Sequence, residues 1–343
     1  MSALGVYSVG GGQRRVGVKL GEEVAEAGMV STLLEGDSLL PLLAAGQAAW
    51  EEVLANLERA LPDLPRLPLS EATMHLPCPI GDYVDFYSSL HHAQNVGRIF
   101  RPTSDALPPN WRHLPIGYHG RSGTIVVDGT PISRPSGQRA EGDFGPTHRL
   151  DFELEMGFLT GNGPGMIAVT AAEEYIFGLV LVNDWSARDI QAWEYQPLGP
   201  FLGKSFATTI SPWVVPLRDL AERRVAAVPQ DPEPLPYLRP PGEAIDLDLE
   251  VRLNEQVISR SNLRHLYWTM SQQLAHATSN GATIRAGDLF ASGTISGPSP
   301  DSLGCLLEIT GGKGPFLQDE DTVVISAGRV EFGLCAGIVV PAR

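Results

Sequence analysis

The sequence contains 343 residues, of which 43% are hydrophobic and 19% are charged, a balance typical of globular proteins rather than disordered chains. The formal net charge is −15 and no basic tract stands out, so we expect neither nucleic acid nor an anionic membrane as a partner. No apolar run approaches the ~20 residues of a membrane helix, and the N-terminus lacks the pattern of a signal peptide. We therefore expect a soluble cytoplasmic protein.

The first 75 residues read as short strands followed by a helix. Residues 1–35 favour strands, and residues 36–61 carry apolar positions at helical spacing, with Pro41 near the helix start. The stretch 61–70 holds three prolines, which is typical of a linker. We therefore place a domain boundary near residue 75.

The remainder, residues 76–343, reads as mainly strands with a few helices. Residues 123–132, 150–159, 176–184 and 244–258 have the composition of strands, several with period-two alternation. Residues 186–195 and 264–281 favour helices, the first capped by Ser186 and the second closed by Gly281. The strict βαβ alternation of a doubly wound fold is missing. This pattern predicts a large β-dominated domain.

The stretch LDFELEMG, residues 150–157, alternates three acids with apolar residues. A strand would place Asp151, Glu153 and Glu155 on one face, spaced roughly 7 Å apart. Like charges at that spacing repel, so the face is either solvated or covered by something positive. Spacing alone leaves both interpretations open.

Further polar groups lie at the ends of apolar segments. Residues 82–121 are dense in acids, tyrosines and histidines, although an ordinary polar surface would look similar. Asp184 ends an apolar run, where an acid often only caps the next helix. Arg188 and Gln191 are three residues apart and so share a helix face.

Two other segments bear on which ligand the protein binds. Residues 199–205 imitate a phosphate loop, but the spacing is one residue short and Pro200 interrupts it, so we reject nucleotide binding. Glu308 lies in an apolar segment that we read as a strand, where a buried carboxylate needs a partner such as histidine. Carboxylates at Asp85, Glu153, Glu155 and Asp184 could converge on one hard cation, Ca²⁺ or Mg²⁺.

Five long segments together resemble the fumarylacetoacetate hydrolase family. They are residues 81–102, 107–138, 150–158, 183–215 and 293–308. The resemblance runs almost continuously from about residue 78 to 215, returns at 285–310 and continues weakly to the end. The first 75 residues match only in organisation.

The resemblance implies a mainly β (α+β) fold. A small SH3-like N-terminal barrel would occupy residues 1–75, and a large mixed β-roll catalytic domain residues 76–343. It also implies a homodimer that uses Ca²⁺ and/or Mg²⁺ and acts on a small dicarboxylate β-diketone. The implied reaction is fumarylacetoacetase activity: hydrolysis of the carbon–carbon bond of 4-fumarylacetoacetate to fumarate and acetoacetate, the last step of tyrosine and phenylalanine degradation.

Relatives of the same fold offer an alternative, because some hydrolyse acylpyruvates or decarboxylate related acids. They usually lack the N-terminal domain and the segment DYVDFYSS…NVGRIFRP, which is present here at residues 82–102. A metal-binding dimer without activity is a second alternative. It would predict loss of His92 or Glu308, and both are present.

The resemblance also implies roles for individual residues. His92 would be the general base and Glu308 its orienting acid, with Arg188, Gln191 and Lys204 as donors to the developing anion. The implied metal ligands are Asp85, Glu153, Glu155 and Asp184, with Lys204 and Thr208 at a second metal. The implied substrate contacts are Tyr87, Arg101, Tyr118, Arg188, Gln191 and Thr294.

Two residues depart from the family pattern or match no role in it. Position 91 is His where a Gln or another polar residue is expected, although the register of the following A-x-NVG favours His92 as the base. Asp151 matches no ligand position. We expect it to lie beyond reach of the metal and to pair with a neighbour or with water.

Overall fold

A long mixed sheet joins the N-terminal part of the molecule to its centre. The computed structural model describes residues 3–100, 103, 105–328 and 331–343. Within these residues the sheet has thirteen strands, and its main path runs in the order β4 (Arg66–Pro68), β3 (Glu23–Glu26), β2 (Arg15–Leu20), β1 (Leu4–Val9), β17 (Trp213–Pro216), β14 (Ile176–Asp184), β13 (Leu154–Thr160), β22 (Leu289–Ala291), β6 (Tyr83–Phe86) and β7 (Gly117–His119). Beside this path, β5 (Ala72–His75) pairs with β1, and β16 (Thr208–Ile210) pairs with β14 and with β8 (Ile125–Val127).

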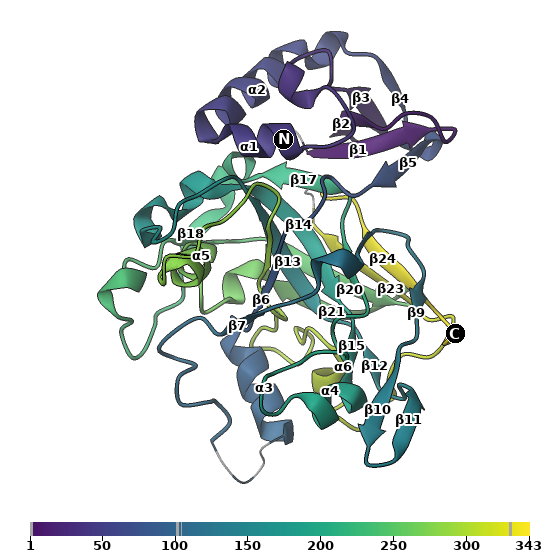
Figure 1. Ribbon diagram of the computed structural model, residues 1–343, viewed down its shortest axis with the longest axis vertical. Helices are drawn as coiled ribbons and strands as arrows, with labels where there is room; N and C mark the ends of the chain where they lie inside the picture. Colours follow the sequence, from purple (N-terminus) through teal and green to yellow (C-terminus); the bar gives the residue numbers. More distant parts are fainter. Residues whose placement is uncertain (1–2, 101–102, 104, 329–330) are drawn as a thin grey trace.

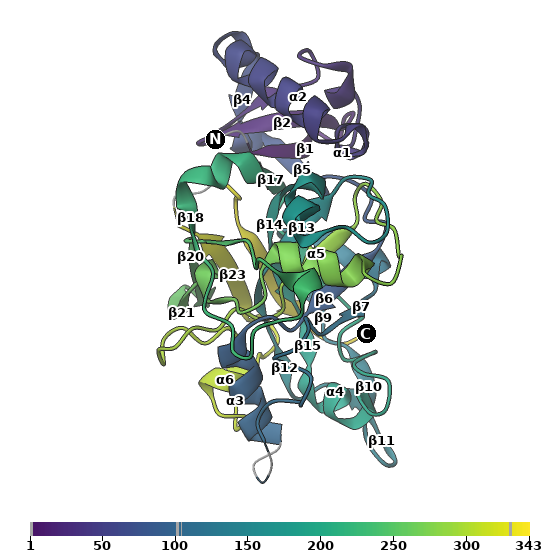
Figure 2. The same ribbon diagram turned by 90° about the vertical axis from the view of Figure 1, so that its left-hand side faces the viewer.

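The N-terminal strands lie at one end of the elongated molecule (Figures 1 and 2). They are covered by α1 (Leu40–Ala45) and α2 (Gln47–Ala60). The sequence predicted one helix over residues 36–61, and the structure divides it at Gly46, whose φ is 83°. Residues with a side chain rarely adopt a positive φ, so the glycine allows the backbone to turn between the two helices.

Strand β14 is buried on both faces, which explains its continuous apolar run. Leu179 and Leu181 belong to one core cluster, whereas Val180 and Val182 belong to the cluster that also contains residues of α2. The first cluster extends into a second sheet of five strands. Its order is β21 (Gln256–Asn262), β20 (Asp248–Leu253), β23 (Thr322–Ala327), β24 (Cys335–Val340) and β9 (Ile132–Ser133).

The remaining elements surround these two sheets. Three small strand pairs are β10 (Ser136–Ala140) with β11 (Asp143–Pro146), β12 (Leu150–Asp151) with β15 (Ser186–Ala187), and β18 (Arg224–Ala226) with β19 (Glu243–Ile245). The other α-helices of the described residues are α3 (Leu90–Phe100), α4 (Arg188–Glu194), α5 (Met270–Thr278) and α6 (Leu306–Ile309). In the described ranges, none of the helices combines the length and the apolar character needed to cross a bilayer.

Three local expectations were wrong in detail. Ser186 does not cap α4, because it pairs with Asp151 in the β12–β15 ladder. The strand predicted over residues 150–159 is interrupted after Asp151, since β12 pairs with β15 while β13 pairs with β14. Glu308 lies in the four-residue helix α6 and not in a strand. These departures concentrate where α3, α4 and α6 gather, at the end opposite the N-terminal strands (Figures 1 and 2).

Candidate active site

Four buried carboxylates meet at one end of the central sheet. Asp85 comes from β6, Glu155 from β13 and Asp184 from the last position of β14. Glu153 comes from the interruption before β13, where its backbone N–H donates to Asn183 instead of a ladder partner. One oxygen from each carboxylate lies within 4.8 Å of those of the other three.

The cations beside this cluster neutralise only part of its charge. Lys204 donates from Nζ to Glu153 and, at 2.7 Å, to Asp184. Arg188 donates from Nη1 to Glu153 at 2.8 Å. On the far side of the cluster, Oδ1 of Asp85 and both carboxylate oxygens of Glu155 are buried without a hydrogen-bond partner among the described residues.

The electrostatics follow from that shortage of donors. Burial and then the charge of Asp184 raise the pKa of Asp85 well above its usual value. Burial and then the charge of Asp85 do the same for the pKa of Glu155. Unpartnered carboxylate oxygens that converge on one point are the donor set that a hard divalent cation such as Ca²⁺ or Mg²⁺ requires. The residues present therefore fit such an ion.

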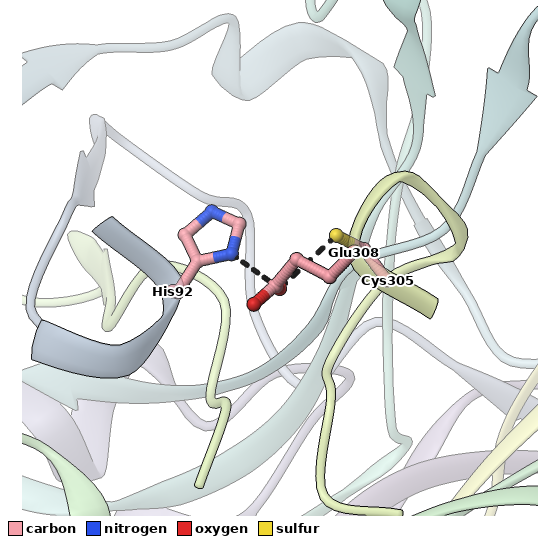
Figure 3. A group of neighbouring side chains, drawn as sticks. All are labelled: His92, Cys305 and Glu308. Carbon is pink, nitrogen blue, oxygen red and sulfur yellow. Dashed lines mark hydrogen bonds and ion pairs between the residues drawn. The ribbon is translucent and has the colours of Figure 1, made fainter. Parts of the chain in front are cut away.

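A histidine and a carboxylate, His92 and Glu308, form a second titratable group beside the cluster, and they bond directly to each other (Figure 3). His92, from α3, contacts Oε2 of Glu308 through its Nδ1 at 2.6 Å. Because Nδ1 is engaged by the carboxylate, we assign the proton to Nδ1, which leaves Nε2 as an acceptor. Figure 3 shows that this second ring nitrogen points away from Glu308.

Glu308 itself is surrounded by donors. Asn95 donates to Oε1 at 2.9 Å, and the hydroxyl of Ser296 donates to Oε2 at 2.7 Å. The thiol of Cys305 donates to the same oxygen at 3.3 Å. Burial would raise the pKa of Glu308, but the charge of His92 and the hydrogen bonds from His92, Asn95 and Ser296 lower it to about 2. Glu308 is therefore held as a carboxylate.

Arg188 connects Glu153 of the cluster with Asp151, an acid outside it. Its Nε donates to Asp151 at 2.8 Å, and its Nη1 also contacts the amide oxygen of Gln191 at 3.4 Å. Its Nη2 is buried and has no hydrogen-bond partner within the described part of the chain. Asp151 thus lies outside the four-carboxylate cluster and pairs with a neighbouring cation.

A cavity of about 410 Å³ brings most of the predicted site residues together. Those that line it are Asp85, Tyr87, His92, Tyr118, Glu153, Glu155, Arg188, Gln191, Lys204 and Thr294. Asp184 lines an adjacent cavity of about 310 Å³, which shares Tyr118, Lys204 and Pro200 with the first. Glu308 and Thr208 lie behind the walls and bond to His92 and Asp184. Arg101 falls outside the described residues.

The structure also separates the two adjacent histidines. The ring of His91 lies edge-on to His265, with 6.3 Å between the ring centres, and does not line the cavity. The ring of His92 lies edge-on to Tyr87 at 5.3 Å and lines the cavity. Of these two neighbours, His92 is the one placed to act at the site.

Sequence reasoning missed two groups of the site. Tyr195 lines the cavity and follows Gln191 by four residues, one helical turn, a spacing that could have revealed it. Asn95 follows His92 by three residues on α3, so the helix presents both to Glu308. Ser296 lies in a glycine-bounded turn and also donates to Glu308, and no local spacing indicates this contact.

Comparison with known proteins identifies the family of this chain. The family model described as "Fumarylacetoacetate (FAA) hydrolase C-terminal" matches residues 83–340. This chain belongs to the fumarylacetoacetate hydrolase family. It is 45% identical to fumarylacetoacetase of Bos taurus, over 98% of this chain and 94% of that protein. It is 46% identical to fumarylacetoacetase of Arabidopsis thaliana, over 93% of this chain and 88% of that protein.

Two solved structures share the fold of this chain. Fumarylacetoacetate hydrolase from Exiguobacterium antarcticum superimposes with a TM-score of 0.67 and 19% sequence identity, covering 100% of both chains. Maleylpyruvate hydrolase from Sphingobium sp. SYK-6 superimposes with a TM-score of 0.63 and 18% identity, over 99% of this chain and 100% of that one. The mixed, sheet-rich architecture described above is therefore that of the fumarylacetoacetate hydrolase family.

Proposed function

We propose that this protein is a fumarylacetoacetase, which hydrolyses 4-fumarylacetoacetate to fumarate and acetoacetate in tyrosine and phenylalanine degradation. One observation carries the proposal: a single cavity presents acceptors and donors that have no hydrogen-bond partner among the described residues. The acceptors are Glu155 and Asp85, and the donors are Arg188 Nη2, Tyr118 OH and Thr294 Oγ1. A cation together with an anionic, oxygen-rich substrate would satisfy both sets.

Asp85, Glu153, Glu155 and Asp184 would hold the divalent cation, for which we propose Ca²⁺ or Mg²⁺. When bound, such an ion polarises the oxygens of a β-diketone and stabilises negative charge that develops on them. We propose Lys204 and Thr208 for a second metal position through their backbone oxygens, as the family pattern implies. Their side chains donate to Asp184, which places both residues next to the first set of ligands.

The base follows from the His92–Glu308 pair. Water is a poor nucleophile at neutral pH, so Nε2 of His92 accepts its proton as the oxygen attacks the carbonyl carbon. Glu308 holds the ring and stabilises the imidazolium that forms, as the acid does in hydrolytic triads. The carbon–carbon bond then breaks and its electron pair stays with the acetoacetate carbon. That carbon takes the proton that His92 accepted from water, which restores the neutral imidazole.

The donors around the cavity bind the charge and the two ends of the substrate. Arg188 and Lys204 place positive charge beside the carbonyl oxygen, and Gln191 places an amide there. Tyr87, Tyr118, Thr294 and Tyr195 line the remaining wall and would contact the substrate. We further propose that Arg101 binds a substrate carboxylate, since arginine binds carboxylates through two parallel hydrogen bonds.

We also propose how the chain is divided into domains. Five antiparallel strands in the order β4-β3-β2-β1-β5 support an SH3-like N-terminal barrel over residues 1–75, with the catalytic domain at 76–343. A homodimer and a cytoplasmic location are proposed by analogy with the family.

The proposal is tested by following the loss of fumarylacetoacetate absorbance. The wild type should turn over this substrate, and His92→Ala should lower kcat by about 10²–10⁴-fold, because a positioned base contributes that much. His276→Ala is the matched control, since His276 contacts Tyr237 away from the cavity. Fast cleavage of an acylpyruvate beside slow cleavage of fumarylacetoacetate would assign the chain to the alternative substrate class.

A further inference from the structure

Asp151 is the one acid of the LDFELEMG stretch that no metal or substrate role explains, yet it is fully buried. Its Oδ1 accepts the backbone N–H of Leu306 at 2.7 Å and that of Phe152 at 2.9 Å. Its Oδ2 accepts from Nε of Arg188 at 2.8 Å and from the backbone N–H of Leu307 at 3.0 Å. One carboxylate therefore contacts two separate parts of the active site.

The first part is helix α6, which carries Glu308. The helix has four residues, and its N-cap residue Cys305 makes no side-chain capping bond. The first N–H groups of a helix have no partner within it, and a single turn is unstable alone. Asp151 satisfies the N–H groups of Leu306 and Leu307 from 155 residues earlier in the chain. The position of Glu308 thus depends on this carboxylate.

The second part is the guanidinium of Arg188. Asp151 accepts from Nε and Glu153 accepts from Nη1, so two carboxylates fix the plane of the group. The remaining nitrogen, Nη2, lacks a protein partner within the described residues, and Arg188 lines the cavity. A guanidinium released from Asp151 would keep its charge but lose its orientation.

We propose that Asp151 is a positioning residue that sets the distance between the oxyanion donor Arg188 and the base pair His92–Glu308. The inference rests on the proposed hydrolytic function. The water that His92 activates attacks the carbonyl whose oxygen Arg188 stabilises. His92 and Arg188 must therefore be held at a fixed distance from each other. Asp151 holds both in position, because each of its oxygens accepts from the backbone of the helix that carries Glu308, and one of them also accepts from the guanidinium of Arg188.

The test is Asp151→Asn, which keeps the shape but replaces one acceptor oxygen with an amide donor facing Arg188 or Leu307. We expect kcat to fall by about 10²-fold, the cost of misplacing reacting groups by about 1 Å. KM and the affinity for Ca²⁺ alone, measured by calorimetry, should change less than threefold, since Asp151 lies outside the four-carboxylate cluster. Asp288→Asn is the matched control, because this buried acid accepts from the backbone N–H of Arg285 away from the cavity. It should keep kcat within threefold.

Double mutants separate positioning from general destabilisation. If Asp151 acts through Glu308 and Arg188, its effect on kcat should largely disappear in the Glu308→Gln and Arg188→Lys backgrounds. Losses that multiply in both backgrounds would overturn the proposal. Asp151→Glu retains the charge but shifts the carboxylate by one methylene, and it should lose about tenfold in kcat even if the Asn variant does not fold.

The failure of this inference is distinct from failure of the proposed function. A wild type that does not hydrolyse fumarylacetoacetate would overturn the function. An active wild type with unchanged kcat in folded Asp151→Asn and Asp151→Glu would overturn only the role of Asp151. A fall in Ca²⁺ affinity that parallels the fall in kcat would instead make Asp151 part of the cation site.

Discussion

Two acidic regions border the same cavity, and they differ in their supply of hydrogen-bond donors. Glu155 has no donor for either oxygen among the described residues, and the pKa of its carboxyl is raised by burial and by Asp85. Glu308 accepts from four side chains, and its pKa is lowered to about 2. We propose that the carboxylates around Glu155 bind a cation, because the described residues leave their oxygens short of donors. The charge of Glu308 is stabilised by hydrogen bonds from side chains of the protein.

This difference teaches that burial does not determine what a carboxylate does. Both carboxylates are removed from water, and an isolated charge is costly in the protein interior. The donors around Glu308 compensate its charge within the fold, whereas the charge around Glu155 remains available for an external ion. The following predictions test whether the two regions are separable in this way.

The largest effect should come from removing the cation. Treatment with a chelator should lower turnover by about 10³-fold or more, since an ion contributes several kcal/mol to stabilising the transition state. Readdition of Ca²⁺ or Mg²⁺ should restore it. Ligands that bind the folded state raise the melting temperature, so the wild type should show a shift on metal addition and Glu155→Gln should not.

Glu308→Gln provides the matched comparison for that experiment. This variant should lose turnover but keep the metal-dependent melting shift, because Glu308 donates no oxygen to the carboxylate cluster. Loss of the shift in Glu308→Gln would show that the two regions are not independent.

An intermediate effect should appear in the pH dependence of stability. The pKa of Glu308 falls from 4.5 to about 2 on folding, so its stabilising contribution is present above pH 4.5 and is lost as pH falls toward 2. Urea unfolding should show the wild type more stable than Glu308→Gln by about 1–3 kcal/mol at pH 7, the cost of leaving buried donors without their charged acceptor. This gap should close between pH 4.5 and 2.

The matched control is Glu58→Gln, which removes an exposed ion pair with Arg218. Surface pairs contribute about 0–1 kcal/mol, so the control should change the free energy of unfolding by less than about 1 kcal/mol. A gap for Glu308→Gln that persists unchanged at pH 2 would contradict the assigned charge state of Glu308.

The smallest effect should come from the weakest donor to Glu308. Cys305→Ser replaces a thiol with a hydroxyl donor, so kcat should stay within about threefold and stability within about 1 kcal/mol. Cys335→Ser is the matched control, since its thiol also donates at 3.3 Å, to the carbonyl of Thr209. A tenfold loss restricted to Cys305→Ser would show that the thiol itself matters.

The sequence indicated much of the carboxylate region and less of the Glu308 region, for a physical reason. Glu155 and Asp184 come from segments that were predicted as strands, and these two strands pair directly. Asp85 comes from β6, which no local pattern predicted and which reaches the cluster by pairing with β22. The alternation at LDFELEMG predicted one strand face for three acids. Glu153 and Glu155 do meet in one cluster, but the strand is interrupted between Asp151 and Leu154, and Asp151 lies outside the cluster.

The Glu308 region depends on contacts between distant segments, which local patterns do not contain. Residues 305–310 were read as a strand from their apolar composition, but the backbone of Leu306 and Leu307 is held as a helical turn by Asp151. The roles of Asn95 and Ser296 appear only when α3 and α6 meet. The resemblance to the family supplied the pairing of His92 with Glu308, and residue periodicity did not.

The junction between β1 and β17 has a practical consequence for shortening the chain. Leu4 and Gly5 pair with Val214 and Trp213, and the missing side chain of Gly5 leaves room for the Trp213 ring, which an added Cβ would meet at 2.6 Å. A chain beginning at residue 76 would leave β17 as an open sheet edge beside a bared apolar face. Such edges recruit other chains, so the isolated catalytic part should aggregate even though every proposed active-site residue is retained.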